Sequence, residues 1–399
     1  MKMVFKQKAK KLAILLLCLL TCVCLALLCG CSNNKLSNMI ADAQSGDTVV
    51  LQNDMTSDNK ITVDKNLTID LGGKTLLLTK SIIVNEGVTL TLKNGKIMGK
   101  EGMDFVFVNN GKMIVECVIK ADDSAECIQN KGDLTLKKGA VTGKRAIIND
   151  GKVVVDGGIL YGIQDYAIIN NGNLTINGGT IGNSILTKYG TLELDFGVEN
   201  NGTTTINNGH VGTVYNNVQT AKAYFFGGRI ESIFNYGYAE VENKNGNLLL
   251  AGASPLTNEG TAVIKSGKIT DIYDEGYASN GAHVNNGGVM TIYGGEFIKL
   301  IDGGSSTTII YDGKFAEAEL QGYADIKGGT FDEQFVLLGN GSADISGGTF
   351  AKGIKITQNE YQNNVTFTLA DLLADGCEFD VAVDLTQPQT DQKVQVKNQ

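Results

Sequence analysis

Three charged residues in the first half of the chain have the types that acid–base catalysis uses. Arg145, Asp150 and Asp165 fall in neighbouring repeats of the sequence, with Tyr161 and Tyr166 close to them in the chain. Carboxylates beside a guanidinium group can exchange protons with a substrate and stabilise developing charge. A solvated surface of ordinary charges explains the same residues and is the simpler interpretation. We therefore name these three as candidates and predict no catalytic residue.

Metal-ligating residue types are sparse. Asp271, Asp274 and Glu275 crowd one segment and carry the oxygen ligands that Ca²⁺ prefers, but without the spacing of an EF-hand loop. A plain acidic turn accounts for them better. His210 and His283 are far apart in the sequence, and no CxxC pair follows residue 30, so a zinc site is not expected. We predict no cofactor, with Ca²⁺ at the acidic turn as the alternative.

The best candidates for binding are aromatic. Tyr293 and Tyr311 hold the same outward position in consecutive copies of a glycine-rich repeat, and Phe226 holds it earlier. Stacked on adjacent coils, such rings form a flat strip suited to the apolar faces of sugars. Cross-strand pairing that only stabilises a sheet is an equal alternative. More tyrosines lie in this half of the chain, and we predict a glycan- or protein-binding face between about residues 224 and 323: Tyr236, Tyr238, Tyr273, Tyr277 and Tyr323.

A tandem repeat from about residue 67 to 350 must position these residues. Its copies include LTIDLGGKTL from Leu67, LTINGGTI from Leu174 and ADISGGTF from Ala343. Each combines period-2 alternation, which indicates a strand, with glycines that permit tight corners. At about 20 residues, a repeat is one turn of a coil whose strands pair with the next coil about 4.8 Å away. We predict an all-β fold, a right-handed parallel β-helix of about 14 coils.

Equivalent side chains should stack along such a coil. An Asn-x-Gly mark recurs half a repeat before the glycine corner, and its asparagines should form a hydrogen-bonded ladder. The marks are Asn85, Asn109, Asn130, Asn149, Asn170, Asn200, Asn235, Asn258 and Asn285. Four phenylalanines share one inward position and should stack in the core: Phe297, Phe315, Phe331 and Phe350.

The first 30 residues resemble an export signal. Five lysines precede an apolar run from Leu12 to Leu28, and Leu28-Cys29-Gly30-Cys31 resembles a bacterial lipobox with Cys31 as the lipidated residue. A plain N-terminal membrane anchor is the alternative. We expect an exported protein held by lipid at the extracytoplasmic face of the cell membrane. Loss of the five lysines moves the net charge from −9 to −14, which excludes nucleic acid as a partner.

The chain divides into four parts. Residues 1–30 are the predicted lipoprotein signal peptide, and 31–37 are the lipidated cysteine and a short tether. Residues 38–359 are the predicted β-helix, opened by a short capping helix that ends at Gly46. Residues 360–399 are a predicted non-repeat C-terminal cap and polar tail. Cys117 and Cys127 are either two buried thiols or a disulfide.

These motifs resemble the pectate-lyase-like β-helix superfamily, and more narrowly the surface-lipoprotein and adhesin-like branch found in gut Firmicutes. The resemblance lies in SGDTVVL and NLTIDLGGKTLLL near the N-terminus and in the GGTF copies at Gly328–Phe331 and Gly347–Phe350. It covers nearly all of the chain after residue 30, but its motifs specify a fold rather than an activity.

The resemblance also brings an enzyme into consideration. The superfamily includes lyases, in which carboxylates hold Ca²⁺ beside an Arg or Lys base, and hydrolases with grouped aspartates. This chain has only two arginines, Arg145 and Arg229, and Val211 after Gly209-His210 breaks the hydrolase pattern. We therefore expect a non-catalytic, adhesin-like surface lipoprotein that binds glycan or another envelope or host surface component. The alternatives are a polysaccharide lyase or glycoside hydrolase on the same fold, and a purely structural rod of the envelope.

Overall fold

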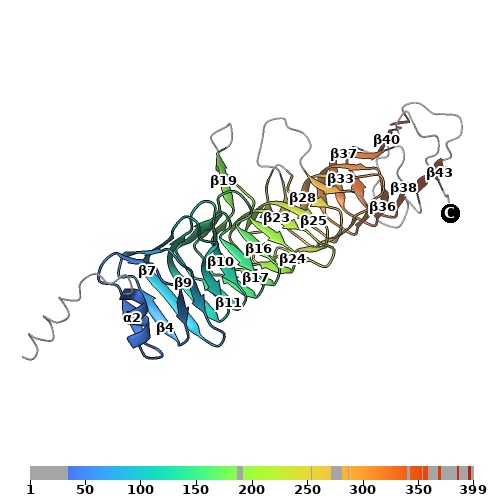
Figure 1. The fold of residues 1–399 in the computed structure, drawn as a ribbon. Helices are drawn as coiled ribbons and strands as arrows, with labels where there is room; N and C mark the ends of the chain where they lie inside the picture. Colours follow the sequence, from blue (N-terminus) through green and yellow to red (C-terminus); the bar gives the residue numbers. More distant parts are fainter. Residues whose placement is uncertain are drawn as a thin grey trace, which may run out of the picture.

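The computed structural model describes residues 35–186, 192–252, 254–270, 281–285, 287–338, 342–352 and 354–357, with short strands at 367–369, 384–385 and 394–396. It is a right-handed parallel β-helix of about 13 turns, close to the 14 predicted (Figure 1). Nearly all of the described residues that form regular structure are in strands, and the all-β prediction is confirmed. No helix in the described residues is long and apolar enough to cross a membrane.

Among the described residues, one helix covers the N-terminal end of the rod. Helix α2 (Lys35–Asp42) buries Leu36 and Ile40 against the first coil, as the sequence predicts (Figure 1). Lys65 extends its Nζ to the carbonyl oxygens of Ala41 and Ala43, at 3.0 and 2.8 Å, at the C-terminal end of the helix. This ammonium group satisfies carbonyls that an α-helix leaves without partners, so the cap ends cleanly.

Each turn contributes strands to three parallel ladders, which we call faces 1, 2 and 3. Face 1 consists of β1 (Thr48–Val50), β4 (Leu67–Asp70), β7 (Thr89–Gly99), β9 (Lys112–Lys120), β11 (Asp133–Leu136), β14 (Lys152–Val155), β17 (Asn173–Ile176), β22 (Thr203–Ile206), β24 (Lys222–Phe225), β26 (Tyr238–Val241), β29 (Thr261–Ile264), β32 (Val289–Ile292), β34 (Thr307–Ile310), β36 (Tyr323–Ile326), β38 (Ser342–Ile345), β41 (Phe367–Leu369) and β43 (Val394–Val396).

Face 2 begins with β2 (Met55–Ser57) and β5 (Thr75–Leu78) and takes in the second halves of β7 and β9. It continues through β12 (Ala140–Gly143), β15 (Ile159–Gly162), β18 (Thr180–Ile181), the first half of β23 (His210–Asn216), the first half of β25 (Arg229–Asn235), β27 (Leu249–Leu250), β30 (Lys268–Ile269), the first halves of β33 (Glu296–Asp302), β35 (Lys314–Leu320) and β37 (Thr330–Leu338), and β39 (Thr349–Phe350).

Face 3 takes the second halves of β23, β25, β33, β35 and β37 in register with shorter strands. These are β3 (Ile61–Val63), β6 (Ile82–Val84), β8 (Phe105–Asn109), β10 (Glu126–Asn130), β13 (Ile147–Asn149), β16 (Ile168–Asn170), β21 (Val198–Asn200), β28 (Leu256–Asn258), β31 (Ala282–Val284), β40 (Ile354–Thr357) and β42 (Asp384–Leu385). Parallel pairing of β41, β42 and β43 with earlier strands therefore continues past residue 359.

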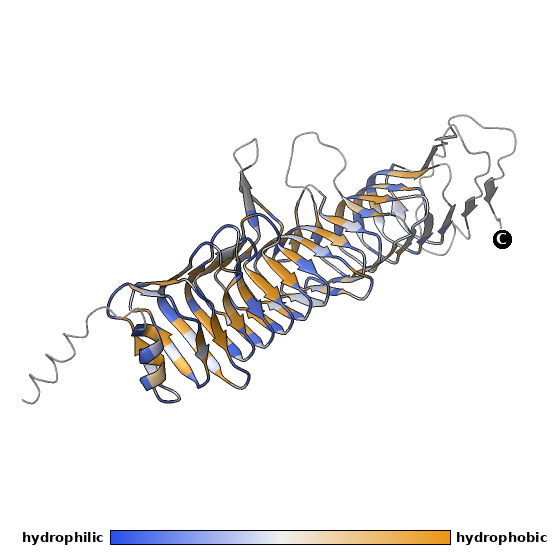
Figure 2. Cartoon of the chain, in the orientation of Figure 1, coloured by the Kyte–Doolittle hydropathy of each residue, from blue (hydrophilic) through white to orange (hydrophobic). Residues whose placement is uncertain are grey.

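The three faces enclose one apolar core along the whole rod. In β14, Val153 and Val155 are buried while Lys152 is exposed, and the same alternation recurs in β11, β17 and β24 of face 1. Hydrophobic residues lie along the strands and hydrophilic ones gather at the turns (Figure 2). Because side chains of a strand alternate between two sides, the period-2 pattern of the sequence sends every second residue inward.

The predicted phenylalanine column is confirmed. Phe297, Phe315, Phe331 and Phe350 stack with 4.8 Å between neighbouring ring centroids and interplanar angles of 2–16°. Phe335 meets two of these rings edge-on. The ring spacing equals the distance between paired strands, so the backbone repeat sets the stacking.

A column of asparagine amides is buried along face 3. Each Nδ2 except that of the last member, Asn258, donates to the Oδ1 of the asparagine on the next coil, at 2.6–2.8 Å. The members are Asn109, Asn130, Asn149, Asn170, Asn200, Asn216, Asn235 and Asn258. Asn216 escaped the sequence pattern because no glycine stands two residues after it. Most Nδ2 groups also donate to a backbone carbonyl, which holds the corner that follows the strand.

The column ends where the sequence pattern predicted it to continue. Register places Val84 and Val284 in line with the asparagines, so Asn85 and Asn285 lie one residue beyond the column. At both ends of the column, the Asn-x-Gly spacing does not identify the residue that lies in register. The glycine of the corner comes one residue later there, so an asparagine two residues before the glycine lies one residue past the column position. With Val84 on the preceding coil, the buried Oδ1 of Asn109 accepts no hydrogen bond.

Asp302 occupies the same register one coil after Val284 and is 1% exposed. Its carboxylate accepts hydrogen bonds from Thr308 Oγ1 at 2.8 Å and from the backbone amides of Gln321 and Gly322. Burial raises the pKa of Asp302 in spite of these donors. The ionised carboxylate therefore weakens this coil at neutral pH.

Two departures from the repeat complete the fold. A hairpin of β19 (Asn183–Leu186) and β20 (Leu192–Asp195) pairs antiparallel between β18 and β21 and projects from the rod (Figure 1). Cys117 and Cys127 are buried free thiols and do not form the disulfide that the sequence left open as an alternative. Burial raises the pKa of Cys117 to about 12, so this thiol is unreactive at neutral pH.

Replacing an asparagine in the middle of the buried column should destabilise the protein strongly. Asn149→Ala removes the acceptor of Asn130 and the donor to Asn170, both buried. We expect the free energy of unfolding to fall by about 3 kcal/mol, because unsatisfied buried polar groups add to the lost bonds. Urea unfolding followed by circular dichroism measures this change.

The matched control is Asn177→Ala, which removes an exposed amide that donates to Asp156 Oδ1 at 2.8 Å. It should cost less than about 0.5 kcal/mol. If both variants lost the same free energy of unfolding, burial of the asparagine column would add no stability beyond that of an exposed hydrogen bond.

Asp302→Asn should stabilise the protein at pH 7, by about 1 kcal/mol, because the buried charge is removed and the hydrogen-bonding shape is kept. A group with a raised folded-state pKa is most favourable when protonated. The advantage of the variant should therefore shrink as the pH falls through the raised pKa of Asp302 towards the unfolded value of about 3.9. Thermal unfolding from pH 7 to pH 4 measures it, and a difference that does not change with pH would contradict this account.

Candidate binding groove

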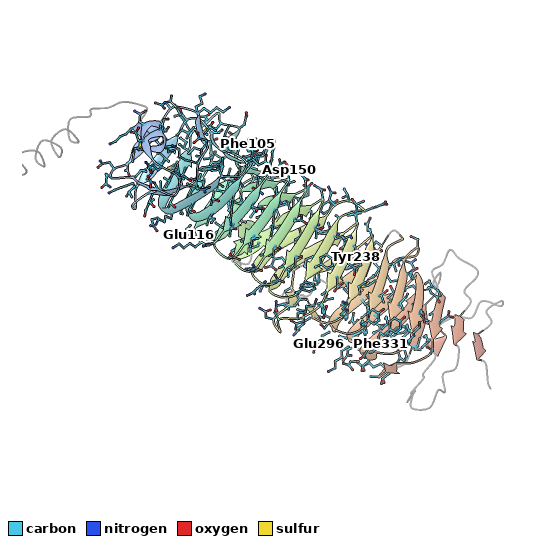
Figure 3. The ribbon with its side chains drawn as sticks, turned by 90° about the horizontal axis from the view of Figure 1, so that it is seen from below. Phe105, Glu116, Asp150, Tyr238, Glu296 and Phe331 are labelled. Carbon is cyan, nitrogen blue, oxygen red and sulfur yellow. The ribbon has the colours of Figure 1, made fainter. Side chains whose placement is uncertain are left out.

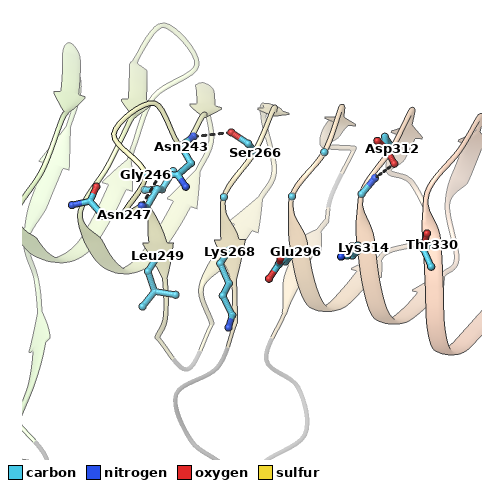
Figure 4. A pocket seen from close by; sticks show the side chains of 15 residues that line it. Asn243, Gly246, Asn247, Leu249, Ser266, Lys268, Glu296, Asp312, Lys314 and Thr330 are labelled. Carbon is cyan, nitrogen blue, oxygen red and sulfur yellow. Dashed lines mark hydrogen bonds between the residues drawn. The ribbon is translucent and has the colours of Figure 1, made fainter.

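A groove of about 650 Å³ lies at the corner between faces 1 and 2, in the second half of the rod (Figure 4). Its floor is formed by successive glycine corners at Gly267, Gly294, Gly295 and Gly313. Its walls carry polar and charged side chains from the strands that follow these corners.

Glycine is required at this floor. The backbone of Gly295 and Gly313 has φ of 118° and 139°, which side-chain-bearing residues rarely adopt. At Gly294, a Cβ atom would lie 2.9 Å from the carbonyl oxygen of Lys265 on the preceding coil. The corners therefore stay bare, and their backbone is accessible between the walls.

One end of the groove is closed by the loop 243–247, which is longer than the equivalent corners. Asn245 Nδ2 donates to the carbonyl of Asn207 at 2.7 Å, and Asn247 Nδ2 donates to Asn208 Oδ1 at 3.0 Å. The backbone amide of Asn243 donates to Ser266 Oγ at 2.9 Å on the next coil (Figure 4). These bonds tie the loop to coils on both sides, so it forms a fixed end wall.

Charged residues line the groove in a single row. Register aligns Lys268, Glu296 and Lys314 on consecutive strands of face 2, and all three line the groove. Within the described part of the chain, these three side chains form no hydrogen bond or ion pair with another residue. A second hollow of about 340 Å³ adjoins them and also contains Ile298 and Asp332. The groove thus offers hydrogen-bond donors and acceptors that are not already committed.

The predicted tyrosine pair stands beside this groove. Tyr293 and Tyr311 stack with centroids 4.8 Å apart and planes 6° from parallel. They are 51% and 41% exposed, and each directly precedes a lining residue, Gly294 or Asp312. Lys327 lies on the coil after Tyr311, and its Nζ is 4.8 Å from the centroid of the Tyr311 ring. Two parallel, solvated rings next to a polar groove give a flat apolar surface beside hydrogen-bonding groups.

Phe226 does not extend this strip. It holds the same column position, but Glu242 and Lys265 occupy the two coils between it and Tyr293. Its ring packs near Tyr224, with a centroid distance of 6.1 Å, and under Lys244 Nζ at 3.6 Å. The shared outward position predicted from the sequence is therefore present, but Phe226 is separated from the stacked tyrosines by two coils.

The candidate acid–base residues are only partly brought together. Arg145 donates to Asp165 Oδ2 at 2.8 and 2.6 Å and contacts Glu126 Oε1 at 3.3 Å. Asp150 lies at the other end of β13 from Arg145, where it accepts a hydrogen bond from Asn171 instead. Burial raises the pKa of Glu126, whose Oε2 has no partner. The guanidinium of Arg145 already contacts the carboxylates of Asp165 and Glu126. Arg145 therefore links neighbouring turns and is poorly placed to bind a substrate.

A second charged cluster was not singled out by the sequence. Glu231 is 5% exposed and accepts hydrogen bonds from Arg229 at 3.0 and 3.2 Å, with His210 Nε2 against its Oε1. Burial opposes ionisation of Glu231, but the bonds from His210 and Arg229 outweigh it and its pKa is lowered. His210 and Arg229 belong to the same register row as Lys268.

Three sets of predicted residues lie outside the described residues. These are the lipobox with Cys31, the acidic segment with Asp271, Asp274 and Glu275, and Tyr273 and Tyr277 of the predicted binding face. Across the ranges that the structure describes, no group of three or more His, Cys, Asp or Glu side chains is arranged to hold a metal ion.

Sequence reasoning missed the charged row of the groove. A signal was present, since Lys268, Glu296 and Lys314 each follow a glycine corner directly. A charged residue directly after a glycine corner does not by itself indicate a site, because the residue that begins the next strand is charged or polar in most repeats.

Comparison with known proteins found no matching family model, no similar curated protein and no similar solved structure. The class of the protein is therefore defined by its fold, a right-handed parallel β-helix. The resemblance to the pectate-lyase-like superfamily stays a prediction from the motifs.

Proposed function

We propose that this chain is an exported surface lipoprotein whose β-helix binds a linear glycan without cleaving it. The observation that carries the proposal is the exposed Tyr293–Tyr311 stack beside the groove. Sugar rings present flat apolar faces edged by hydroxyl groups. Such a ring can lie on the tyrosines while its hydroxyls reach the polar groove.

The dimensions of the groove support an extended chain rather than a compact ligand. Its lining residues recur once per coil, about every 4.8 Å, which is close to the length of one pyranose unit in an extended glycan. Successive sugar units can therefore meet equivalent groups on successive coils. The lysine ammonium groups supply donors and Glu296 supplies an acceptor, and both suit hydroxyl-rich ligands.

The position of the groove along the rod supports a surface role. The N-terminus leads into α2 at one end, whereas Glu296 lies far along the rod, beyond Glu116 (Figure 3). Nine coil steps separate β4 from β29 on face 1, about 43 Å. A lipid on Cys31 would hold the capped end at the membrane and the groove away from it, which favours a partner within the cell-wall zone.

Removing both rings of the stack should abolish glycan binding. A glycan array with the soluble chain from residue 32 onwards first identifies the ligand. Titration calorimetry should then show that Tyr293→Ala/Tyr311→Ala weakens binding at least about tenfold, since the sugar loses its apolar platform.

The control is Tyr161→Ala, an outward tyrosine of β15 in the other half of the rod, which should bind as the wild type does. The proposal fails if no glycan binds or if the double variant binds unchanged. Release of reducing or unsaturated ends from the bound glycan would instead identify an enzyme.

Cys31→Ser should release the protein from the membrane if Cys31 carries the lipid. Full-length wild type expressed in a bacterial host should incorporate labelled palmitate and partition into detergent, and the variant should do neither. Cys29→Ser is the matched control and should keep the label. Equal labelling of wild type and Cys31→Ser would refute lipidation at this residue.

A further inference from the structure

A second aromatic cluster lies on face 3, at the base of the β19–β20 hairpin. We call it the aromatic patch, and it consists of Tyr166, Phe196, Tyr215, Phe234 and Tyr236. Tyr166 meets Phe196 edge-on at 5.3 Å and Tyr215 at 6.3 Å between centroids. Tyr215 in turn lies 6.3 Å from Phe234 and 5.5 Å from Tyr236. The rings thus form a continuous strip across several coils.

The patch is not part of the core. Tyr215 and Phe234 point outward between buried neighbours of β23 and β25, and Phe196 is 38% exposed. Phe196 has a backbone φ of 44°, which residues other than glycine seldom adopt. Its amide donates to Asp195 Oδ1 at 2.8 Å, which holds this conformation. A bulky residue kept exposed in an unfavourable backbone region points to a role beyond stability.

Three carboxylates, those of Asp195, Glu199 and Glu259, lie near the tyrosines of the patch. Asp195 accepts a hydrogen bond from Thr213 Oγ1 at 2.7 Å, and Glu199 accepts from the amides of Asn201 and Asn217 at 3.4 Å. In the described ranges, no ion pair joins Asp195, Glu199 or Glu259 to a cationic side chain, and Arg145 nearby is engaged by Asp165. Burial and the neighbouring Asp195 and Glu199 carboxylates raise the pKa of Tyr166. The patch therefore combines negative ring faces with uncompensated carboxylates.

We propose that the aromatic patch binds a methylated ammonium group, such as the head of choline. Aromatic faces attract cations, and the carboxylates add long-range attraction for positive charge. A methylated ammonium is preferred to a lysine-like ammonium because its methyl groups pack on the rings, whereas the compact ammonium is strongly hydrated. This site is independent of the glycan groove and rests on different residues.

The test uses choline and its neutral analogue 3,3-dimethylbutan-1-ol, which replaces the ammonium nitrogen by carbon. Titration calorimetry with the soluble chain should show choline binding in the millimolar range and binding of the analogue at least about fivefold weaker. Equal affinities would overturn the proposal, because they would show a merely apolar surface. Absence of choline binding would also overturn it.

Variants locate the site. Tyr215→Leu should weaken choline binding about fivefold or more, and Tyr215→Phe should retain it because the ring face is kept. Glu199→Gln leaves all the rings in place and should weaken choline binding while leaving the analogue unaffected, which serves even if Tyr215→Leu does not fold. Tyr293→Ala/Tyr311→Ala should bind choline as the wild type does. Binding unchanged in both Tyr215→Leu and Glu199→Gln would place any choline site elsewhere and refute the proposal.

Discussion

The whole structure depends on parallel hydrogen bonding between successive coils at a spacing of about 4.8 Å. Every coil must place its backbone in register with the one before, so each side chain is set directly against its equivalent. Neighbouring coils therefore share their side-chain environment, and a residue suitable at one level is suitable at the next. The ring centroids of stacked phenylalanines, and those of Tyr293 and Tyr311, are 4.8 Å apart because the coils that carry them are separated by this distance.

The same register explains how polar groups survive inside the rod. An amide is both donor and acceptor, so an asparagine column satisfies itself from one coil to the next, and most members also bond the backbone at a corner. A carboxylate lacks the donor, and Asp302 must recruit Thr308 and two backbone amides in its place. The contrast between Asn258 and Asp302 shows why asparagine is the residue that repeats.

Candidate functions lie where the repeat is interrupted. The long loop 243–247 closes the groove, and the bare glycine corners beside it give the groove its depth. The hairpin inserted before β21 carries the chain to Phe196 and so creates one end of the aromatic patch. Regular coils provide a rigid frame whose outer side chains are mostly small, polar or paired. Insertions alter only the local surface, because the hydrogen bonds of the frame resume on the following coil.

The sequence by itself determined the coil, because alternation, glycine corners and repeat length leave few other ways to bury the apolar residues. It also predicted the phenylalanine column and the outward tyrosines, since stacking follows directly from equivalent positions. It did not determine which equivalent residues are neighbours or where the corners change length. Hence the two coils between Phe226 and Tyr293 were not foreseen, Asn216 was missed, and Asn85 and Asn285 were assigned to a column that passes through Val84 and Val284. Only the tertiary structure brought Lys268, Glu296 and Lys314 to one groove and Tyr166 to Tyr215. Those contacts depend on the register of paired coils and on side-chain direction, which no local pattern encodes.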